Sequence, residues 1–363
     1  MIVARAPLRL SFGGGGTDLP AYYEPFGGFV VSSAITAACH VQIEPRPGHS
    51  GDVLLRSRDY RRDVMIPSGA PVTLDEPLSL PRAALAWFAA RGQRASGITI
   101  TTASDVAPGS GLGSSSAMTV ALLAALACHF HQPMSPRELA AAACEVEIDL
   151  LSRPIGRQDQ YASALGGLNT LTFAASGVAA QPLALALAHE RALQGSLLLF
   201  ATGRTRDSAS VLGAQRAASR SDAEVIARLH QLKGIAHEMA ATLRAGDIAG
   251  FGALLDASWQ LKRGLAAGVT SADIDHWYAL ACSLGAYGGK IAGAGGGGHL
   301  LLCAPPERRA AISAALQRAG LRPVGVIFDH GGALATPDLR EDDWRGDRVW
   351  KRELPDAALL HQP

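Results

Sequence analysis

Three glycine-rich segments constrain the fold of this chain more than any other feature of its sequence. Glycine makes up 40 of the 363 residues. The excess over an average share of about 7% gathers at residues 13–16, 109–113 and 293–298. Clustered glycines indicate a backbone that passes close to another group or adopts positive φ at neighbouring residues. One such segment is often only a tight turn, but three in one chain favour a ligand that carries phosphate.

The middle segment is typical of an anion-binding site. A strand is predicted at Gly97–Ser104, a Gly/Ser loop follows it, and an apolar helix is predicted from about Ser114 to Phe130. Unpaired N–H groups and the positive end of the helix dipole then point into the loop. Ser114, Ser115 and Ser116 add hydroxyls that can cap the helix, bind a phosphate oxygen or ligate magnesium. A helix cap without a ligand is the alternative, and it needs only one serine.

The third segment, GAGGGG at residues 293–298, matches the pattern GxGxxG but not its context. A dinucleotide-binding fingerprint opens a helix, whereas Gly298 is followed directly by the strand-like run HLLLCA. The segment therefore predicts a glycine-rich hairpin against a ligand, and a nicotinamide-dependent oxidoreductase is the less favoured interpretation. None of the four lysines lies in a GK[ST] sequence, which excludes a Walker A phosphate loop.

Polar side chains accompany the first glycine segment. Arg9 lies on a predicted buried strand, where a guanidinium needs an anionic or carbonyl partner. Thr17 and Asp18 directly follow the glycines. They could simply cap a turn, but a short aspartate beside a glycine-rich loop is also a suitable acceptor for sugar hydroxyls.

Four carboxylates, Glu145, Glu147, Asp149 and Asp159, lie in the stretch ACEVEIDLLSRPIGRQDQYASALGG. Most helical carboxylates are solvated. Asp159 differs because it lies between two glutamines, among apolar residues and a glycine pair, where a lone surface charge is less expected. Phosphoryl transfer needs a magnesium-binding carboxylate and a separate aspartate that orients the acceptor. Glu147 and Asp159 supply one of each.

The order of the predicted elements favours an α+β chain with two domains, because strands gather early and helices follow them. An alanine-rich stretch at Ser176–Gln194 is interpreted as the crossover between the halves. We therefore predict an N-terminal domain over residues 1–190, a C-terminal domain over 191–340 and a surface tail over 341–363. Beside the strand and helix named above, the predicted elements are strands at Ile2–Ser11, Phe29–Ile35, Ala38–Glu44, Val53–Ser57, Leu168–Phe173, Ser196–Thr202 and Val324–His330, and helices at Leu78–Arg91 and Ser135–Leu151.

The charge balance and the cysteines limit the partners and the compartment. Lys+Arg 33 against Asp+Glu 32 leaves a net charge of +1, which gives no field that would draw the chain to nucleic acid or an acidic membrane. The longest apolar stretches are shorter than the roughly 18 residues of a spanning helix, and the first residues alternate like a strand. Five cysteines without a CxxC pair indicate free thiols in a reducing compartment. We therefore predict a soluble cytoplasmic protein, with homo-oligomerisation left open.

With all three segments in place, the chain resembles the GHMP kinases, the family of galactokinases, homoserine kinases and mevalonate kinases. The family's phosphate motif has the form PxxxGLGSSA, and Pro108–Ala117 (PGSGLGSSSA) matches it with one extra serine. The first motif corresponds to APLRLSFGGGGTDLP and the third to KIAGAGGGGHLLL, in the family order and across nearly the whole chain. The resemblance implies a ribosomal-protein-like α/β N-terminal half, a ferredoxin-like C-terminal half, and ATP and Mg²⁺ as cofactors.

The resemblance also implies a role for each matching residue. Ser115 and Glu147 would ligate magnesium. Asp159 would orient the acceptor, and Arg9 would lie near the transferring phosphoryl group. The residues that would bind the phosphates are Pro108, Gly109, Ser110, Gly111, Leu112, Gly113, Ser114 and Ser115. The residues that would bind the substrate are Gly15, Gly16, Thr17, Asp18, Arg157, Gly295 and Gly296.

The first motif narrows the substrate class. Galactokinases and mevalonate kinases carry Glu-His after its glycine, whereas this chain has a glycine run followed by Thr17 and Asp18. This form, and the later GRQDQYASALGG, are similar to bacterial D-glycero-D-manno-heptose 7-phosphate kinases. Those enzymes phosphorylate the anomeric hydroxyl on the route to nucleotide-activated heptose for capsule or lipopolysaccharide. An L-fucokinase and a non-catalytic sugar sensor are the alternatives. Arg157 and the pair Arg204 and Arg206 are candidates for the substrate phosphate, and residues 57–87 for adenine.

Overall fold

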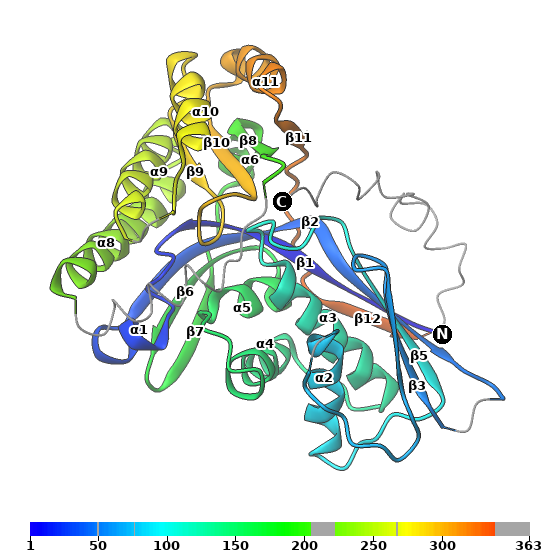
Figure 1. The fold of residues 1–363 in the computed structure, drawn as a ribbon. Coiled ribbons are helices and arrows are strands. Elements are labelled where there is room, and N and C mark those ends of the chain that lie inside the picture. Colours follow the sequence, from blue (N-terminus) through cyan, green and yellow to red (C-terminus); the bar gives the residue numbers. More distant parts are fainter. Residues whose placement is uncertain (49–50, 76, 205–221, 266–267, 338–363) are drawn as a thin grey trace.

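The computed structural model of the chain describes residues 1–48, 51–75, 77–204, 222–265 and 268–337 (Figure 1). Two sheets, one of eight strands and one of four, divide these residues into two layered halves. The mixed α and β content confirms the predicted α+β class. The predicted tail at 341–363 and Arg206 lie outside the described residues.

The larger sheet is built on two long antiparallel strands, β1 (Ile2–Gly13) and β2 (Gly28–Pro45). The two strands predicted at 29–35 and 38–44 are one strand with a bulge, where the pairing shifts between Pro7 and Leu8. The strand order is β12-β1-β2-β5-β3-β4, with β6 paired to β2 and β7 to β6. The other strands are β3 (Val53–Ser57), β4 (Arg62–Ile66), β5 (Ile98–Ser104), β6 (Leu168–Ala174), β7 (Gly177–Pro182) and β12 (Leu334–Pro337).

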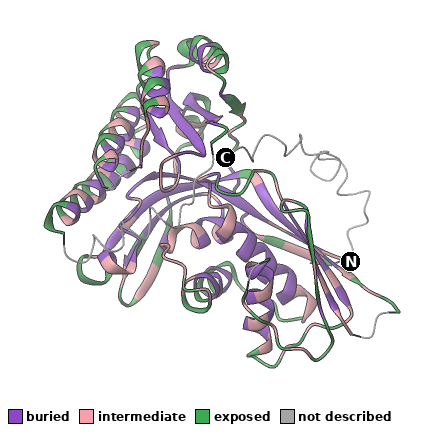
Figure 2. Ribbon diagram, in the orientation of Figure 1, coloured by how far each residue is buried: buried purple, intermediate pink, exposed green. Residues whose placement is uncertain are grey.

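Helices of the first half pack beside this sheet, and the apolar helix α3 (Ser114–His129) is its central partner. Almost every residue of α3 from Ser116 onward is buried, because Ala, Val and Leu occupy all of its faces; Figure 2 shows this layer in purple. The predicted helix at 135–151 is α4 (Pro136–Cys144) continued by a π-helix, η1 (Glu145–Leu150). The other helices here are α1 (Pro20–Phe26), α2 (Ser79–Ala89), α5 (Gln158–Leu165) and α6 (Leu187–Ser196).

The second half packs helices on the four-stranded antiparallel sheet, whose order is β11-β8-β10-β9. Side-chain caps begin its three long helices: Asp222, Asp247 and Ser271 accept hydrogen bonds from the first-turn N–H groups. The predicted glycine-rich hairpin is confirmed, because the third segment joins β9 to β10. The strands are β8 (Leu197–Ala201), β9 (Gly288–Ile291), β10 (His299–Cys303) and β11 (Arg322–Val324). The helices are α8 (Ala223–Ala245), α9 (Ile248–Arg263), α10 (Ala272–Ser283), the short 3-10 helix η2 (Pro306–Arg308) and α11 (Arg309–Arg318).

Two predicted segments differ from the structure. The stretch 176–194, predicted only as a crossover, contains regular structure, because its first part forms β7, which pairs with β6, and α6 begins within it. The strand predicted at Val324–His330 ends at Val324, and Phe328 makes only an isolated bridge to Ile35. The chain then returns to the larger sheet as β12, beside β1. The domain boundary near residue 190 stays a prediction.

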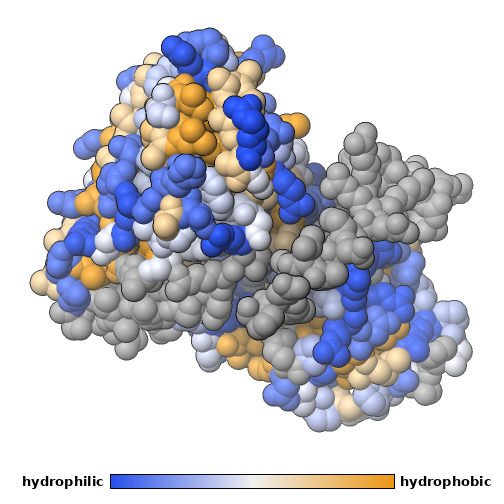
Figure 3. Space-filling view, turned by 45° about the horizontal axis from the view of Figure 1, so that its top comes forward, coloured by the Kyte–Doolittle hydropathy of each residue, from blue (hydrophilic) through white to orange (hydrophobic). Residues whose placement is uncertain are grey.

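The described helices include none with the length and apolar character that a bilayer crossing requires. Figure 3 shows hydrophilic and apolar residues mixed over the described part of one face.

Candidate active site

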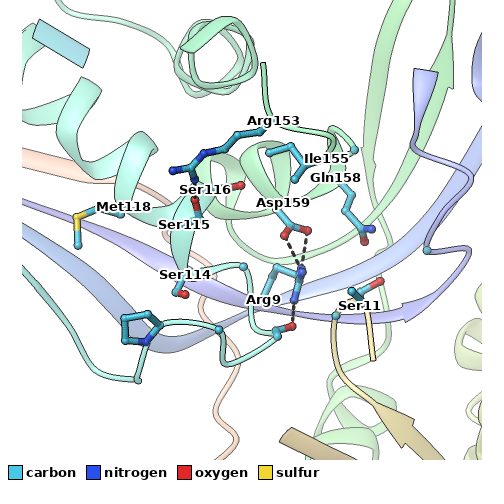
Figure 4. Close-up of a pocket in the computed structure, with 18 of the residues that line it drawn as sticks. Arg9, Ser11, Ser114, Ser115, Ser116, Met118, Arg153, Ile155, Gln158 and Asp159 are labelled. Carbon is cyan, nitrogen blue, oxygen red and sulfur yellow. Dashed lines mark hydrogen bonds and ion pairs between the residues drawn. The ribbon is translucent and has the colours of Figure 1, made fainter. Parts of the chain in front are cut away.

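A cavity of about 670 Å³ brings the three glycine-rich segments together. Gly15 and Gly16 line it from the first segment, Gly109, Gly111 and Gly113 from the second, and Gly293 from the third. In Figure 4 the cavity runs from Met118, past the three serines of α3, to Asp159 and Gln158. Residues from both halves of the chain therefore form one site.

Arg9 and Asp159 form an ion pair in the middle of this view (Figure 4). Arg9 comes from β1 and Asp159 from the first turn of α5. Nε of Arg9 donates to Oδ1 of Asp159 at 2.7 Å and Nη2 donates to Oδ2 at 2.6 Å, while Nη1 donates to the Gly111 carbonyl at 2.6 Å. The pair is bidentate, and it links the catalytic carboxylate predicted from sequence to the glycine loop.

Ser115 and Glu147 also meet, as the magnesium-site prediction requires. Oγ of Ser115 donates to Oε1 of Glu147 at 2.7 Å, and Gln160 donates to Oε2 at 2.8 Å. Glu147 is fully buried, and burial raises its pKa against the opposing effect of the Arg153 charge and of its hydrogen bonds. Arg153 donates to Ser115 Oγ and to Glu147 Oε1. The neighbouring acids Glu145 and Asp149 are exposed.

The donor set fits a magnesium ion. A hydroxyl and a carboxylate oxygen are the hard ligands that Mg²⁺ takes, and Mg²⁺ completes its shell with water and substrate phosphates. A buried carboxylate needs a cation beside it, and the Arg153 guanidinium meets that need in this structure. No group of three or more His, Cys, Asp or Glu among the described residues could hold a metal by itself. A site of one serine, one glutamate and phosphate oxygens agrees with that finding.

Most residues of the loop predicted to bind phosphates, Pro108–Ser115 (hereafter the phosphate loop), line the cavity. Of the residues predicted to bind phosphates, Pro108, Gly109, Gly111, Gly113, Ser114 and Ser115 line the cavity. Ser110 and Leu112 are buried on the other side. The Ser110 carbonyl accepts a hydrogen bond from His299 at 2.8 Å, and the Leu112 carbonyl accepts one from the Arg9 N–H at 3.0 Å. These two residues hold the loop against its neighbours.

The third glycine segment packs directly on the phosphate loop. A Cβ on Gly111 would lie 2.5 Å from the Ala292 carbonyl oxygen, and Gly111 has φ +76°. Gly293 and Ala294 reach the cavity. The predicted substrate residues Gly295 and Gly296 are not among the described residues that line it, and they pack on Val269. The glycines therefore allow two backbones, one from each half, to touch.

Residues of the first segment divide into lining and framework groups. Asp18 lines the cavity and is buried; it accepts hydrogen bonds from the N–H groups of Gly16 (3.0 Å) and Gln158 (3.3 Å). Burial, and then the charge of Asp159, raise the pKa of Asp18. Thr17 is fully buried, and its hydroxyl is bonded to the backbone of Gly14 and Phe29. Asp18 can reach a sugar, whereas Thr17 shapes the turn.

Arg157 and Arg204, the two described arginines considered for a substrate phosphate, are not among the residues that line the cavity. Arg157 lies over the Tyr23 ring at 5.6 Å, and its buried Nε has no hydrogen-bond partner among the described residues. Arg204 forms an ion pair with Asp273 and lies 6.0 Å from the Trp277 ring. Neither arginine lines the cavity in the described part of the chain.

Sequence reasoning does not find several polar residues of the cavity, among them Arg153, Gln158 and Lys262. The one sequence feature that could have drawn attention to Lys262 is the rarity of lysine, since the chain has only four. The opposite end of the cavity is more apolar and includes Leu80, Val106 and Met118. Leu80, with Asp59 and Tyr60, falls within the predicted adenine region, whose role stays a prediction.

Comparisons with known proteins identify the family. The family models of the GHMP kinases N terminal domain and the GHMP kinases C terminal match residues 79–167 and 239–321. The chain is 29% identical over 299 residues to a D-glycero-alpha-D-manno-heptose 7-phosphate kinase of Campylobacter jejuni, covering 81% of this chain and 86% of that protein. It is 31% identical over 276 residues to a mevalonate kinase of Aeropyrum pernix, covering 74% of this chain and 81% of that protein.

A solved structure agrees with these matches. The crystal structure of a D-glycero-D-manno-heptose 1-phosphate kinase from Bacteroides thetaiotaomicron superposes with a TM-score of 0.78 at 25% identity. The superposition covers 94% of this chain and 100% of that one. The two-domain GHMP kinase fold expected from the three motifs is therefore confirmed. The chain belongs to the GHMP kinase family and is an ATP-dependent phosphotransferase.

Proposed function

We propose that the protein transfers the γ-phosphoryl group of ATP to the anomeric hydroxyl of D-glycero-D-manno-heptose 7-phosphate and forms the 1,7-bisphosphate. The observation that carries the proposal is the Arg9–Asp159 ion pair in a cavity to which all three glycine-rich segments contribute. Asp159 offers a carboxylate to the acceptor hydroxyl. The phosphate loop and Ser114 offer N–H and O–H donors to the nucleotide.

In the proposed step the hydroxyl oxygen of the sugar forms a bond to the γ-phosphorus. The bond from that phosphorus to its bridging oxygen breaks, and ADP leaves with the electron pair. The hydroxyl proton moves to an oxygen of Asp159, which later releases it to water. Each oxygen of Asp159 accepts one bond from Arg9, and each has a further lone-pair site for the hydroxyl. Arg9 thus fixes the direction from which Asp159 meets the acceptor.

Ser115 and Glu147 are the residues that would hold Mg²⁺. Held there, the ion would supply positive charge against the negative charge that develops on the transferring phosphoryl group. Gln160 and Ser116 support Glu147 by hydrogen bonding to its carboxylate, and so keep the ligand oriented. Arg153 donates to Ser115 Oγ and to Glu147 Oε1, and its guanidinium would be available to a phosphate oxygen if the ion replaced it.

The sugar-phosphate assignment rests on the first segment and on the heptose kinase relatives. Gly15, Gly16 and Asp18 form a wall of the cavity near Asp159. A buried carboxylate held by two backbone N–H groups is a rigid acceptor for sugar hydroxyls. Arg157 is the candidate for the substrate phosphate, because its neighbours Gly156 and Gln158 both line the cavity.

An ADP-release assay across a panel of acceptors tests the proposal. The panel holds heptose 7-phosphate, free heptose, fucose, galactose and mevalonate, and the product is identified by phosphorus NMR. We expect the highest kcat/KM with heptose 7-phosphate and a product phosphorylated at the anomeric oxygen. Arg157→Gln should raise KM for the sugar phosphate far more than for ATP, while Arg204→Gln should change neither. A preference for an acceptor without phosphate would contradict the substrate assignment.

A further inference from the structure

The positive charge of Arg9 is balanced within the protein by the carboxylate of Asp159. Arg9 gives Nε and Nη2 to the two oxygens of Asp159 and Nη1 to the Gly111 carbonyl. Its side chain is 6% exposed, so solvent does not release it from this arrangement. The Arg9–Asp159 pair is therefore close to neutral as a unit. A transferring phosphoryl group carries negative charge on three equatorial oxygens, and this pair alone does not balance that charge.

Lys262 brings a second cation to the same cavity from the other half of the chain. It lies near the end of α9, is 8% exposed and lines the cavity wall. Its ammonium donates to the carbonyl of Gly293, in the third glycine segment. Within the described residues this carbonyl is the only hydrogen-bond acceptor of Lys262, and an ammonium has three N–H donors. Two donors are therefore left for a ligand in the cavity.

Charged groups from several elements surround this ammonium. Arg9 on β1 and Lys290 on β9 are the cations, and Asp18 and Asp159 are the anions that act on Lys262. Burial, followed by the Arg9 charge, lowers the pKa of Lys262 to about 8. The side chain is still mostly protonated at neutral pH, so it is an ammonium when substrates bind.

Two other lysines, Lys290 and Lys233, have structural contacts only among the described residues and serve as a comparison for Lys262. Lys290 donates to the carbonyls of Ser11 and Phe12 at 2.9 and 3.1 Å, and it is not among the described residues that line the cavity. Lys233 on α8 donates to the carbonyls of Phe26 and Gly27 in the same manner. Each of these joins the two halves through two carbonyl groups. Lys262 differs because it donates to one carbonyl, in its own half of the chain, and lines the cavity.

We propose that Lys262 is a further catalytic residue, whose ammonium donates hydrogen bonds to the phosphoryl group as it passes from ATP to the acceptor. The proposal rests on the proposed function and deepens it. Lys262 gives no proton away in the step: the hydroxyl proton goes to Asp159, and Lys262 stays an ammonium throughout. Its bond to Gly293 holds it at the third glycine segment, where that segment meets the phosphate loop.

Three variants test this role: Lys262→Met, Lys262→Arg and, as a matched control, Lys233→Met. We expect Lys262→Met to lower kcat by roughly 10²- to 10³-fold, the range for removing one transition-state donor, with a smaller change in KM for ATP. Lys262→Arg keeps a cation and should recover part of kcat. Lys233→Met should leave kcat unchanged, because that lysine contacts the Phe26 and Gly27 carbonyls and the Tyr22 ring, all outside the described cavity wall.

The pH profile of kcat/KM distinguishes a catalytic lysine from a structural one, since it reports the ionisation of essential groups in the free enzyme. Wild-type kcat/KM should fall above about pH 8, where Lys262 loses its proton. The Lys262→Arg variant should lack that fall because arginine stays charged. A Lys262→Met variant with kcat within threefold of wild type would overturn the proposal, and so would an unchanged basic limb in Lys262→Arg. If Lys262→Met does not fold, the Lys262→Arg profile decides alone.

The assay uses whichever acceptor the wild-type enzyme phosphorylates fastest, or water if ATP hydrolysis is the only reaction. Rejection of heptose 7-phosphate would therefore overturn the proposed substrate while the comparison of lysine variants still decides the role of Lys262.

Discussion

At the scale of single residues, the site depends on pairing two opposite charges at short distance. Asp159 alone would be free to rotate at the start of a short helix. The bidentate contact with Arg9 holds both carboxylate oxygens. A Cβ on Gly113 would lie 3.2 Å from a side-chain atom of Arg9 and from one of Asp159, so glycine at this position lets the loop pack closely on the pair. The carboxylate is thus oriented before any substrate arrives.

Asp159→Asn is expected to lower the rate of phosphoryl transfer by roughly 10²- to 10⁴-fold, the range for losing a general base. An amide keeps the size of the side chain but cannot take the hydroxyl proton. Nucleotide binding, measured by calorimetry, should stay near the wild-type value. Asp149→Asn, which changes an exposed acid nearby, is the matched control and should leave turnover intact. Equal turnover in both variants would remove Asp159 from the mechanism.

Lys262→Met is expected to stabilise the fold at pH 7. Burial and the Arg9 charge lower the pKa of Lys262 from 10.5 to about 8, so the folded state disfavours its charged form. Between about pH 8 and 10.5 the unfolded chain binds more protons, and wild-type stability therefore rises with pH in that window. Below pH 8 the whole penalty is present. The melting temperature of the variant should exceed that of wild type at pH 7, and the gap should shrink toward pH 10. A gap that widens with pH would contradict this assignment.

At the scale of elements, a change of helix type separates Glu147, the proposed metal ligand, from its neighbour Glu145. The helix predicted at 135–151 changes from α to π geometry at Glu145. The wider turn leaves Glu145 on the outside, where it pairs with Arg91 and Trp87, and buries Glu147 against Ser115. Extra turns of this type are frequent at functional sites.

Ser115→Ala and Glu147→Gln should each raise the Mg²⁺ concentration needed for half-maximal activity, and their effects should not add, because both remove one site. Binding of Mn²⁺, followed by electron paramagnetic resonance with ADP present, should weaken in parallel. Glu145→Gln serves as the control on the same π-helix. If Glu145→Gln changes the metal dependence and Glu147→Gln does not, the wrong carboxylate has been assigned.

The sequence predicted those elements and site residues that depend on local patterns of residues. β5, α3 and the β9–β10 hairpin follow from hydrophobic periodicity and glycine position, and Ser115 and Asp159 follow from motifs. The π-turn is not visible in sequence, since it depends on how α2 and α3 pack against Glu145 and Glu147. The inward position of Lys262 and the hydrogen bonds that occupy Thr17 depend on contacts between distant segments. Local patterns carry no information on such contacts.

At the scale of the whole molecule, the candidate active site lies at an interface between two halves of one chain. The phosphate loop belongs to the first half and the third glycine segment to the second, and their backbones touch at Gly111 and Gly293. Each half alone would have an incomplete cavity wall.

Gly111→Ala should weaken both stability and nucleotide binding. An alanine there would have φ +76° and a Cβ 2.5 Å from the Ala292 carbonyl oxygen. Gly69→Ala is matched in backbone strain, with φ +75° and nothing within 4 Å of a Cβ. Gly111→Ala should therefore lower the unfolding free energy by about 1 kcal/mol or more beyond Gly69→Ala. It should also raise KM for ATP, which Gly69→Ala should not do. Equal effects of the two variants would show that the contact between the halves contributes nothing.

The pairing of β1 with β12 has a consequence for how the protein is made. Ile2 lies opposite Pro337, so this edge of β1 waits for a strand that is synthesised much later. At about 5–20 residues per second, translation keeps that edge of β1 open for roughly 20–70 seconds. An open apolar edge is a template for pairing with another nascent chain. The ribosome-bound chain, in which this edge is unpaired, is therefore more exposed to aggregation than the finished enzyme, in which β12 covers it.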